Sequence, residues 1–268
     1  MGAVRRSPDP AGATGSVARG VWWVGAGHVV SQLSWFGSLL LVAALVPPHS
    51  FGSVSAAMVV VQVAWLLVGS GTRGAFVVSS RLSRSQVWRS LRSTVAAGAA
   101  VGLGAALLAT PLLPLLAPGA DPLVLQALAL SVALYGTSIV PLALLQKEMH
   151  FKQHAAANAG AATLASALAA VVALAGLGIW ALVLRQVLFQ GLLAAFAWVA
   201  ARNLIPDAGA DDPPARRDPV ARWFLGLSLV AFVSFNVDYV MVGRYTSVAE
   251  LGLYALAFTL AFAPVTQF

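Results

Sequence analysis

The sequence of 268 residues has little charge. Asp, Glu, Lys and Arg make up only 9% of it, apolar residues make up 59%, and the mean hydropathy is +0.85. A soluble domain carries about 25% charged residues, so this chain cannot cover itself with a water-facing surface. We therefore predict an all-α fold, a polytopic transmembrane helix bundle lying in a lipid bilayer.

Cysteine is absent from the sequence. Its absence excludes disulfides, thiol catalysis and cysteine-ligated metal sites. The four histidines offer no replacement. His150 and His154 are four residues apart at a loop-to-helix boundary, with no third ligand beside them. We therefore expect no metal, no cofactor and no enzyme activity.

Basic residues are also few, and their placement is informative. The 16 Lys and Arg give a net charge of +7, and most stand in alternate loops between apolar runs. The turns at residues 47–50, 118–122 and 176–178 hold none. The positive-inside rule assigns the base-containing loops and the N-terminus to the cytoplasm. Since the positive charge sets topology in this way, we expect no nucleic acid partner.

Eight apolar runs alternate with these loops, and a span takes about 20 residues. The expected spans are residues 21–46, 54–68, 95–116, 123–145, 155–175, 179–201 and 224–242, and a last run that begins near Leu251. The longest polar stretch separates the first six from the last two. The expected parts are a disordered cytoplasmic tail (1–18), a first six-helix lobe (19–201), a cytoplasmic linker (202–222), and the first hairpin of a second, incomplete lobe (223–268).

The second group of spans echoes the first. Three positions keep their residue type at a spacing of 200, namely Ser34 and Ser234, Val42 and Val242, and Gly52 and Gly252. A long-period repeat of this kind is typical of transporters that are built from repeated helix bundles.

Polar side chains inside the spans mark candidate functional positions. His28 and Gln32 are four residues apart in the first span, and Gln186 and Gln190 are four apart in the sixth, so each pair shares a helix face. Asn236 lies in the seventh span. Such polar faces point either to partner helices or to a water-filled cavity, and the pattern leaves both interpretations open.

Two charges stand inside the spans at similar depth. Asp238 is the only acid within an apolar run, and a carboxylate there is costly unless it faces a partner or a polar cavity. At 1.5 Å per residue, Arg185 and Asp238 both lie roughly 8 to 11 Å below the outer boundary. We hypothesise that they share one layer of a central cavity, where Arg185 would hold an anionic head group. The alternative is a structural ion pair between bundles.

Four short motifs occur in order along the chain. They are residues 45–52 (LVPPHSFG), 140–152 (VPLALLQKEMHFK), 176–183 (GLGIWALV), and 236–244 with 251–254 (NVDYVMVGR and LGLY). Together they resemble the polysaccharide transporter (Wzx-like) family of the multidrug/oligosaccharidyl-lipid/polysaccharide flippase superfamily. The resemblance extends over nearly the whole chain past Arg19.

The resemblance implies two six-helix lobes around a central cavity, working by alternating access. It also implies an undecaprenyl-diphosphate-linked sugar as substrate, a location in the inner (plasma) membrane, and work beside a polysaccharide polymerase or glycosyltransferases. Members of the family continue to about twelve or more spans. We therefore expect the present sequence to stop within the eighth span of this plan.

The expected function is that of a membrane flippase or exporter of lipid-linked oligosaccharide or polysaccharide precursors. The residues expected along the substrate path are Arg185, Asp238, Asn236, His28, Gln32, Gln186 and Gln190. The alternatives are a cation-coupled multidrug exporter, which Asp238 alone favours, and a non-transporting subunit of a polysaccharide assembly complex. A glycosyltransferase would need an acidic loop cluster, whereas Asp211 and Asp212 stand in a Pro- and Ala-rich linker.

Overall fold

The computed structural model describes residues 10–69, 83–205 and 220–262. Seven helices within these ranges are long and apolar enough to cross a membrane, and an eighth apolar helix is shorter. The protein is an all-helical, polytopic membrane bundle, so the fold class predicted from composition is confirmed. Residues 206–219 of the predicted linker, and Arg73 and Arg81 of a predicted basic loop, lie outside the described residues.

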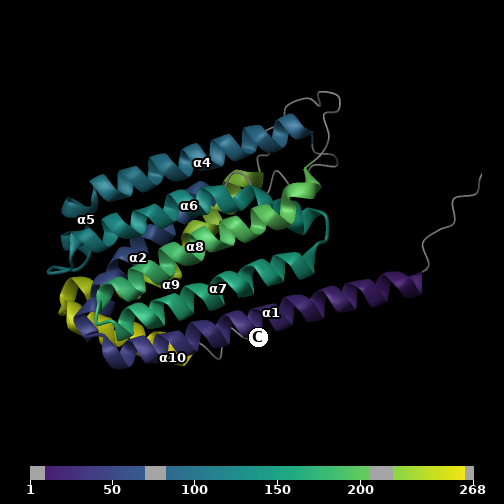
Figure 1. Ribbon diagram of the computed structural model, residues 1–268. Helices are drawn as coiled ribbons and strands as arrows, with labels where there is room; N and C mark the ends of the chain where they lie inside the picture. Colours follow the sequence, from purple (N-terminus) through teal and green to yellow (C-terminus); the bar gives the residue numbers. More distant parts are fainter. Residues whose placement is uncertain (1–9, 70–82, 206–219, 263–268) are drawn as a thin grey trace, which may run out of the picture.

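The helices run side by side, and α1 reaches past its neighbours at one end (Figure 1). In chain order they are α1 (Pro10–Leu45), α2 (Pro48–Gly69), α4 (Arg84–Leu107), α5 (Ala109–Leu116), α6 (Pro122–Lys147), α7 (Phe151–Leu174), α8 (Ile179–Ala201), the short 3-10 helix η1 (Arg202–Leu204), α9 (Val220–Tyr245) and α10 (Val248–Phe262).

The turns after α1, α5, α7 and α9 gather at one end of the molecule, on the left of Figure 1. These turns contain no Lys or Arg, and we call this end the base-poor end. Arg244, in the last turn of α9, is an exception to the predicted alternation of charge. The opposite end, which includes the start of α4 with its exposed Arg84, Arg89 and Arg92, is the base-rich end.

Two predicted boundaries differ from the structure. Residues 10–18 were expected to be a disordered tail, but α1 begins at Pro10. Proline suits the first position of a helix, because the N–H that it lacks has no partner there. The rest of the predicted tail, residues 1–9, lies outside the described residues.

The third predicted span is the second difference. α4 begins well before the apolar run, because Ser83 and Gln86 form a capping box in which each side chain accepts a hydrogen bond from the other's backbone N–H, at 3.3 and 3.2 Å. The helix then breaks at Leu108 before α5. Pro111 follows the break, and it has no N–H to continue the ladder of the preceding helix.

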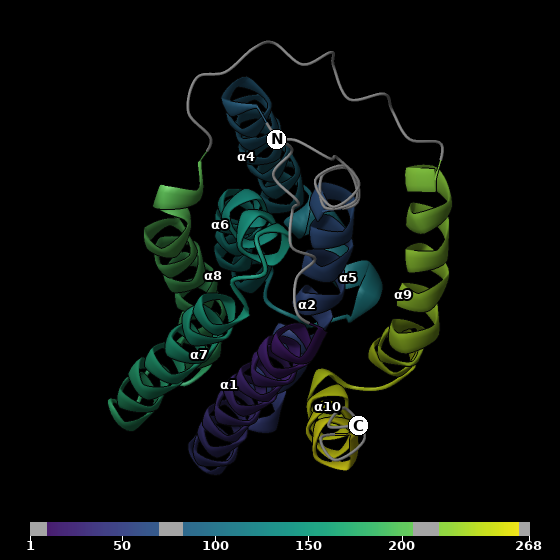
Figure 2. The ribbon, with the colours of Figure 1, turned by 90° about the vertical axis from the view of Figure 1, so that its right-hand side faces the viewer.

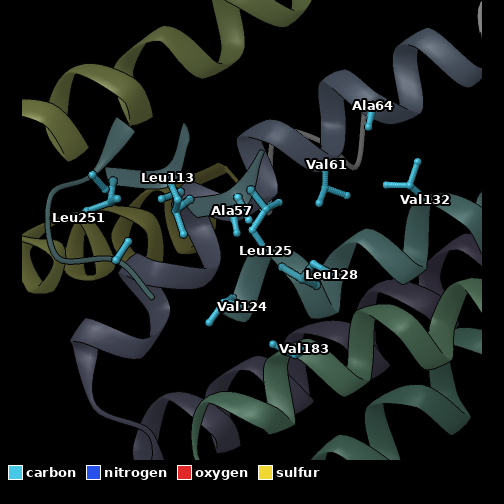
Figure 3. Packing of buried hydrophobic residues seen from close by; sticks show 14 of the residues in the cluster. Ala57, Val61, Ala64, Leu113, Val124, Leu125, Leu128, Val132, Val183 and Leu251 are labelled. Atoms are coloured by element: carbon cyan, nitrogen blue, oxygen red, sulfur yellow. The ribbon is translucent and has the colours of Figure 1, made fainter. Parts of the chain in front are cut away.

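The core of the first bundle is built around α6, which contacts α2, α4 and α8 (Figure 2). Leu125, Leu128 and Val132 of α6 are fully buried. They share one apolar cluster with Val61 of α2 and Val183 of α8 (Figure 3). A helix with this many contacts is apolar on all sides, so it carries no amphipathic pattern.

Glycine brings α4 and α6 together backbone to backbone. A Cβ atom at Gly136 would overlap the carbonyl oxygen of Thr94, and one at Gly98 would lie 3.0 Å from the carbonyl oxygen of Val132. Gly104, also on α4, has nothing within 4 Å of the equivalent point. Of these three glycines, only Gly136 and Gly98 are required by packing.

Replacing Gly136 should destabilise the bundle. We expect Gly136→Ala to lower the free energy of unfolding by about 1–3 kcal/mol, because the new methyl group overpacks a backbone contact. Gly104→Ala is the matched control and should be neutral or slightly stabilising, since alanine is the better helix former. Thermal unfolding of the purified protein in detergent measures both, and equal melting temperatures for the two variants would contradict the packing argument.

Candidate functional site

Arg185 lies in α8, six residues after the helix begins, and it contacts an aromatic ring of α1. Its guanidinium carbon is 5.3 Å from the centre of the Trp35 ring. One of its terminal nitrogens, Nη1, is buried without a hydrogen-bond partner. The long side chain can reach α1 because α7, which contacts both α1 and α8, buries almost only alanine. Arg185 is thus a partly stabilised cation with one free donor inside the protein.

Asp238 lies in α9 and is held by a residue of α10. Tyr254 Oη donates a hydrogen bond of 2.5 Å to Asp238 Oδ2, whereas Asp238 Oδ1 is buried without a partner. Tyr239, Tyr254 and Phe258 form an aromatic cluster beside it, with ring centres 5.5 to 6.0 Å apart. The carboxylate therefore has one satisfied oxygen and one available oxygen.

The two charges have separate partners. In the part of the chain that the structure describes, Arg185 contacts Trp35 and Asp238 contacts Tyr254, and no ion pair between the two charges is present. Arg185 is six residues after the first residue of α8 and Asp238 is seven residues before the last residue of α9, which places each about 9–11 Å from the base-poor end. Their position in one layer of a shared cavity stays a prediction.

The amide candidates differ in their surroundings. Gln190 is only 5% exposed, and its Oε1 is buried with no hydrogen-bond partner. Gln186, one turn earlier on the same face, is partly buried. Asn236 is 7% exposed, and its Nδ2 donates to the carbonyl oxygen of Phe232 within α9. The side-chain nitrogen of Asn236 is therefore hydrogen-bonded within α9, whereas the side-chain oxygen of Gln190 is an acceptor without a donor.

His28 and Gln32 lie in the membrane-spanning part of α1, Gly25–Leu45, in its half nearer the base-rich end. α1 packs on α7 along a stripe of small residues, in which a Cβ atom at Gly27 would meet Ala155 and the hydroxyls of Ser34 and Thr163 are 2.9 Å apart. His28 is exposed and Gln32 is partly buried. The packing of α1 on α7 therefore leaves the His28 side chain exposed.

Sequence reasoning missed the aromatic partners of the two charges. Trp35 and Tyr254 lie in apolar runs, where a Trp or Tyr is normally interpreted as a residue of the hydrophobic core. Trp65 was missed in the same way, and its Nε1 is buried with no hydrogen-bond partner. The signal that could have found Tyr254 is its distance from the helix end. It lies six residues after the start of α10, and Asp238 lies seven residues before the end of α9.

One charged group outside the seven long spans has a clear role. Ser247 and Glu250 form a capping box at the start of α10, in which the backbone N–H and then the hydroxyl of Ser247 donate to Glu250 Oε2, at 2.8 and 2.9 Å. These hydrogen bonds lower the pKa of the Glu250 carboxyl below its usual value. Glu250 is therefore a structural residue of the α9–α10 turn.

Comparison with known proteins decides the family. Residues 41–268 match the model of a family described as polysaccharide biosynthesis protein. The chain belongs to this family. It is also 26% identical over 256 residues to the succinoglycan biosynthesis transport protein ExoT of Rhizobium meliloti, in a match that covers 93% of this chain and 50% of that protein. The chain thus spans about half the length of this curated relative. No solved structure matches it.

The predicted resemblance to the Wzx-like polysaccharide transporter family is thereby confirmed. This member of the polysaccharide biosynthesis protein family is a multi-pass membrane protein that is similar to a transport protein.

The contact of Arg185 with Trp35 should be measurable as a coupling energy. We expect a double-mutant cycle of Arg185→Met and Trp35→Leu to give about 1–2 kcal/mol, the range for a cation above a desolvated ring. Unfolding in detergent supplies the free energies. Trp180, which is exposed on the same helix, gives the control cycle with Trp180→Leu. A coupling near zero for Trp35 would show that the ring does not stabilise the guanidinium.

Loss of the tyrosine donor should leave the Asp238 carboxylate uncompensated. We expect Tyr254→Phe to lower stability by about 1.5–3 kcal/mol, as for other hydrogen bonds to charged groups. Adding Asp238→Asn should recover part of this loss, because the amide needs less compensation. Tyr245→Phe, at a strongly exposed position, should change nothing. Additive effects of Tyr254→Phe and Asp238→Asn would contradict a direct hydrogen bond.

Proposed function

We propose that the protein moves a lipid-linked oligosaccharide or polysaccharide precursor across the inner (plasma) membrane during polysaccharide biosynthesis. The observation that supports this most is the match to a transport protein for succinoglycan biosynthesis over 93% of the chain. Because the match covers half of that relative, the proposal concerns the transporter whose first lobe this chain supplies.

The proposed substrate is a sugar unit on undecaprenyl diphosphate, whose three parts need different surroundings. The lipid tail stays in the bilayer. The diphosphate is an anion, and the exposed Arg84, Arg89 and Arg92 at the base-rich end would attract it from the cytoplasmic leaflet. Inside the protein, Arg185 would take over one phosphate, since a guanidinium binds phosphate oxygens in a bidentate manner.

The remaining candidates would contact the sugar. Gln190 and Asp238 each keep one buried oxygen without a partner, and sugar hydroxyls are suitable donors to both. Gln186, His28 and Gln32 would contribute further polar contacts along the path. Rocking of the two lobes then exposes the head group on the far side. No covalent bond changes, so no catalytic group is required.

The proposed topology follows from charge. Basic residues concentrate at the base-rich end, and the positive-inside rule assigns that end, with the N-terminus, to the cytoplasm. The base-poor end then faces outward, and substrate leaves there. Partner proteins of the assembly, such as a polymerase or glycosyltransferases, would act on the substrate before or after this transfer.

A cation-coupled multidrug exporter is the second candidate. The observation that favours it is the cluster of Tyr239, Tyr254 and Phe258 beside the Asp238 carboxylate, because aromatic faces and a carboxylate together suit an organic cation. Arg185 does not favour it, since a buried guanidinium repels cations.

Transport assays with the intact gene separate these candidates. We expect proteoliposomes to move a fluorescent undecaprenyl-diphosphate oligosaccharide but not ethidium. Arg185→Gln should reduce the rate at least about tenfold, and Arg185→Lys should retain part of it, because a point charge replaces a bidentate contact. Arg244→Gln, at an exposed arginine of the base-poor end, is the control.

Two outcomes would contradict the proposal. Ethidium efflux without movement of the oligosaccharide would favour the drug exporter. Movement of neither, together with failure of the intact gene to complement a flippase-deficient strain, would favour a non-transporting assembly subunit.

A further inference from the structure

The sequence repeat corresponds to a repeat of helix boundaries. α1 ends at Leu45 and α9 ends at Tyr245, and the next helices begin at Pro48 and Val248. Both pairs are 200 positions apart, the spacing at which Gly52 and Gly252 also occur. The hairpin of α1 and α2 and the hairpin of α9 and α10 are therefore equivalent units.

These two hairpins meet through equivalent residues. A Cβ atom at Gly52 would overlap the carbonyl oxygen of Val248, and a Cβ atom at Gly252 would overlap the carbonyl oxygen of Pro48. Each glycine thus touches the first residue of the other hairpin's second helix. A reciprocal contact of this kind is what a two-fold operation produces. No side chain separates the backbones of α2 and α10 at this point.

Further contacts join the first bundle to the hairpin of α9 and α10 at the base-poor end. A Cβ atom at Gly243 of α9 would lie 2.9 Å from the carbonyl oxygen of Leu116 and 3.4 Å from the Cβ atom of Ala117. Leu251 of α10 is fully buried in the core cluster that contains Leu113 of α5 (Figure 3). The first bundle and the second hairpin are therefore firmly packed at the base-poor end.

Toward the base-rich end, the described part of α9 buries no side chain, and α1 packs on α7 of its own bundle. From residue 226 to residue 235 of α9 no side chain is buried, and Asn236 is the first buried residue. From residue 25 to residue 37 of α1 none is buried either, and Ser38 is the first. Figure 2, seen from the base-rich end, shows α9 standing apart from α4, α6 and α8. Packing between the repeats is confined to one end.

We infer that the reciprocal contact of Gly52 and Gly252 is the gate at the base-poor end, closed in this structure, and that it opens in each transport cycle. The inference rests on the proposed function, because it names the part that must separate for substrate to leave. Glycine suits a gate at both positions. At this point the two backbones meet without interdigitating side chains, whereas any added side chain would hold the helices apart.

A disulfide across the closed end tests the gate. These 268 residues contain no cysteine, so the introduced pair supplies the only thiols within them. Ala117→Cys with Gly243→Cys joins the first bundle to α9, and its Cβ distance of 3.4 Å is close to the range of about 3.5–4.5 Å found in disulfides. Gly102→Cys with Val132→Cys joins α4 to α6 within the first bundle, at 3.6 Å.

The two pairs are matched in packing. In both, the glycine's new Cβ atom meets a carbonyl oxygen at 2.9 Å. We expect oxidation of the Ala117–Gly243 pair to reduce oligosaccharide transport at least about tenfold and dithiothreitol to restore it. The control pair should transport equally in both states. Equal transport by the oxidised and reduced gate pair would overturn the inference.

A second measurement does not depend on transport. Ser53, next to Gly52, is buried, so Ser53→Cys should react slowly with a membrane-impermeant maleimide. Adding Gly252→Ala should increase the labelling several-fold, because the methyl group keeps the gate from closing. Gly226→Ala, which has open space around it, should leave the labelling unchanged.

Unchanged labelling with Gly252→Ala would overturn the inference whatever the substrate is. Absence of transport by the unmodified protein, with labelling that still responds to Gly252→Ala, would overturn the proposed function and leave the gate standing.

Discussion

Close approach of helix backbones is the interaction on which this structure depends. Lipid removes the hydrophobic drive that holds helices together in water, so association relies on dispersion forces and short contacts. Such contacts need small residues. α4 meets α6 at Gly136, α1 meets α7 at Gly27, and α2 meets α10 at Gly52 and Gly252. The first two contacts lie inside one bundle, and the third lies between equivalent hairpins.

The buried polar groups fit around this scaffold. The alanine-rich α7 keeps α1 and α8 near enough for Arg185 to reach Trp35, and the α9–α10 hairpin brings Tyr254 to Asp238. Each charge is partly compensated by an aromatic residue, and each retains an atom without a partner. Incomplete compensation is costly in a purely structural role, but it leaves hydrogen-bonding capacity for a polar substrate.

Much of the fold was predictable from the sequence, because an apolar run of span length has few alternatives to a membrane helix. The start of α8 and the positions of the turns followed from hydropathy and charge. The early start of α4 did not follow from hydropathy, because the polar residues of the capping box at Ser83 do not contribute to an apolar run. The charges and amides of the candidate site stood out against an apolar background, whereas Trp35 and Tyr254 did not. The repeat predicted that Gly52 and Gly252 are equivalent, but equivalence along a chain does not reveal contact in space.

The reciprocal contact also constrains how such a protein can evolve. If the two hairpins descend from one duplicated segment, the copies have not been free to drift independently at these positions. A larger residue acquired at position 52 collides with the opposite copy, and so does one at position 252. Substitutions after duplication are therefore restricted where the two copies meet, at Gly52 and Gly252, while the surfaces that face away from the other copy tolerate substitution.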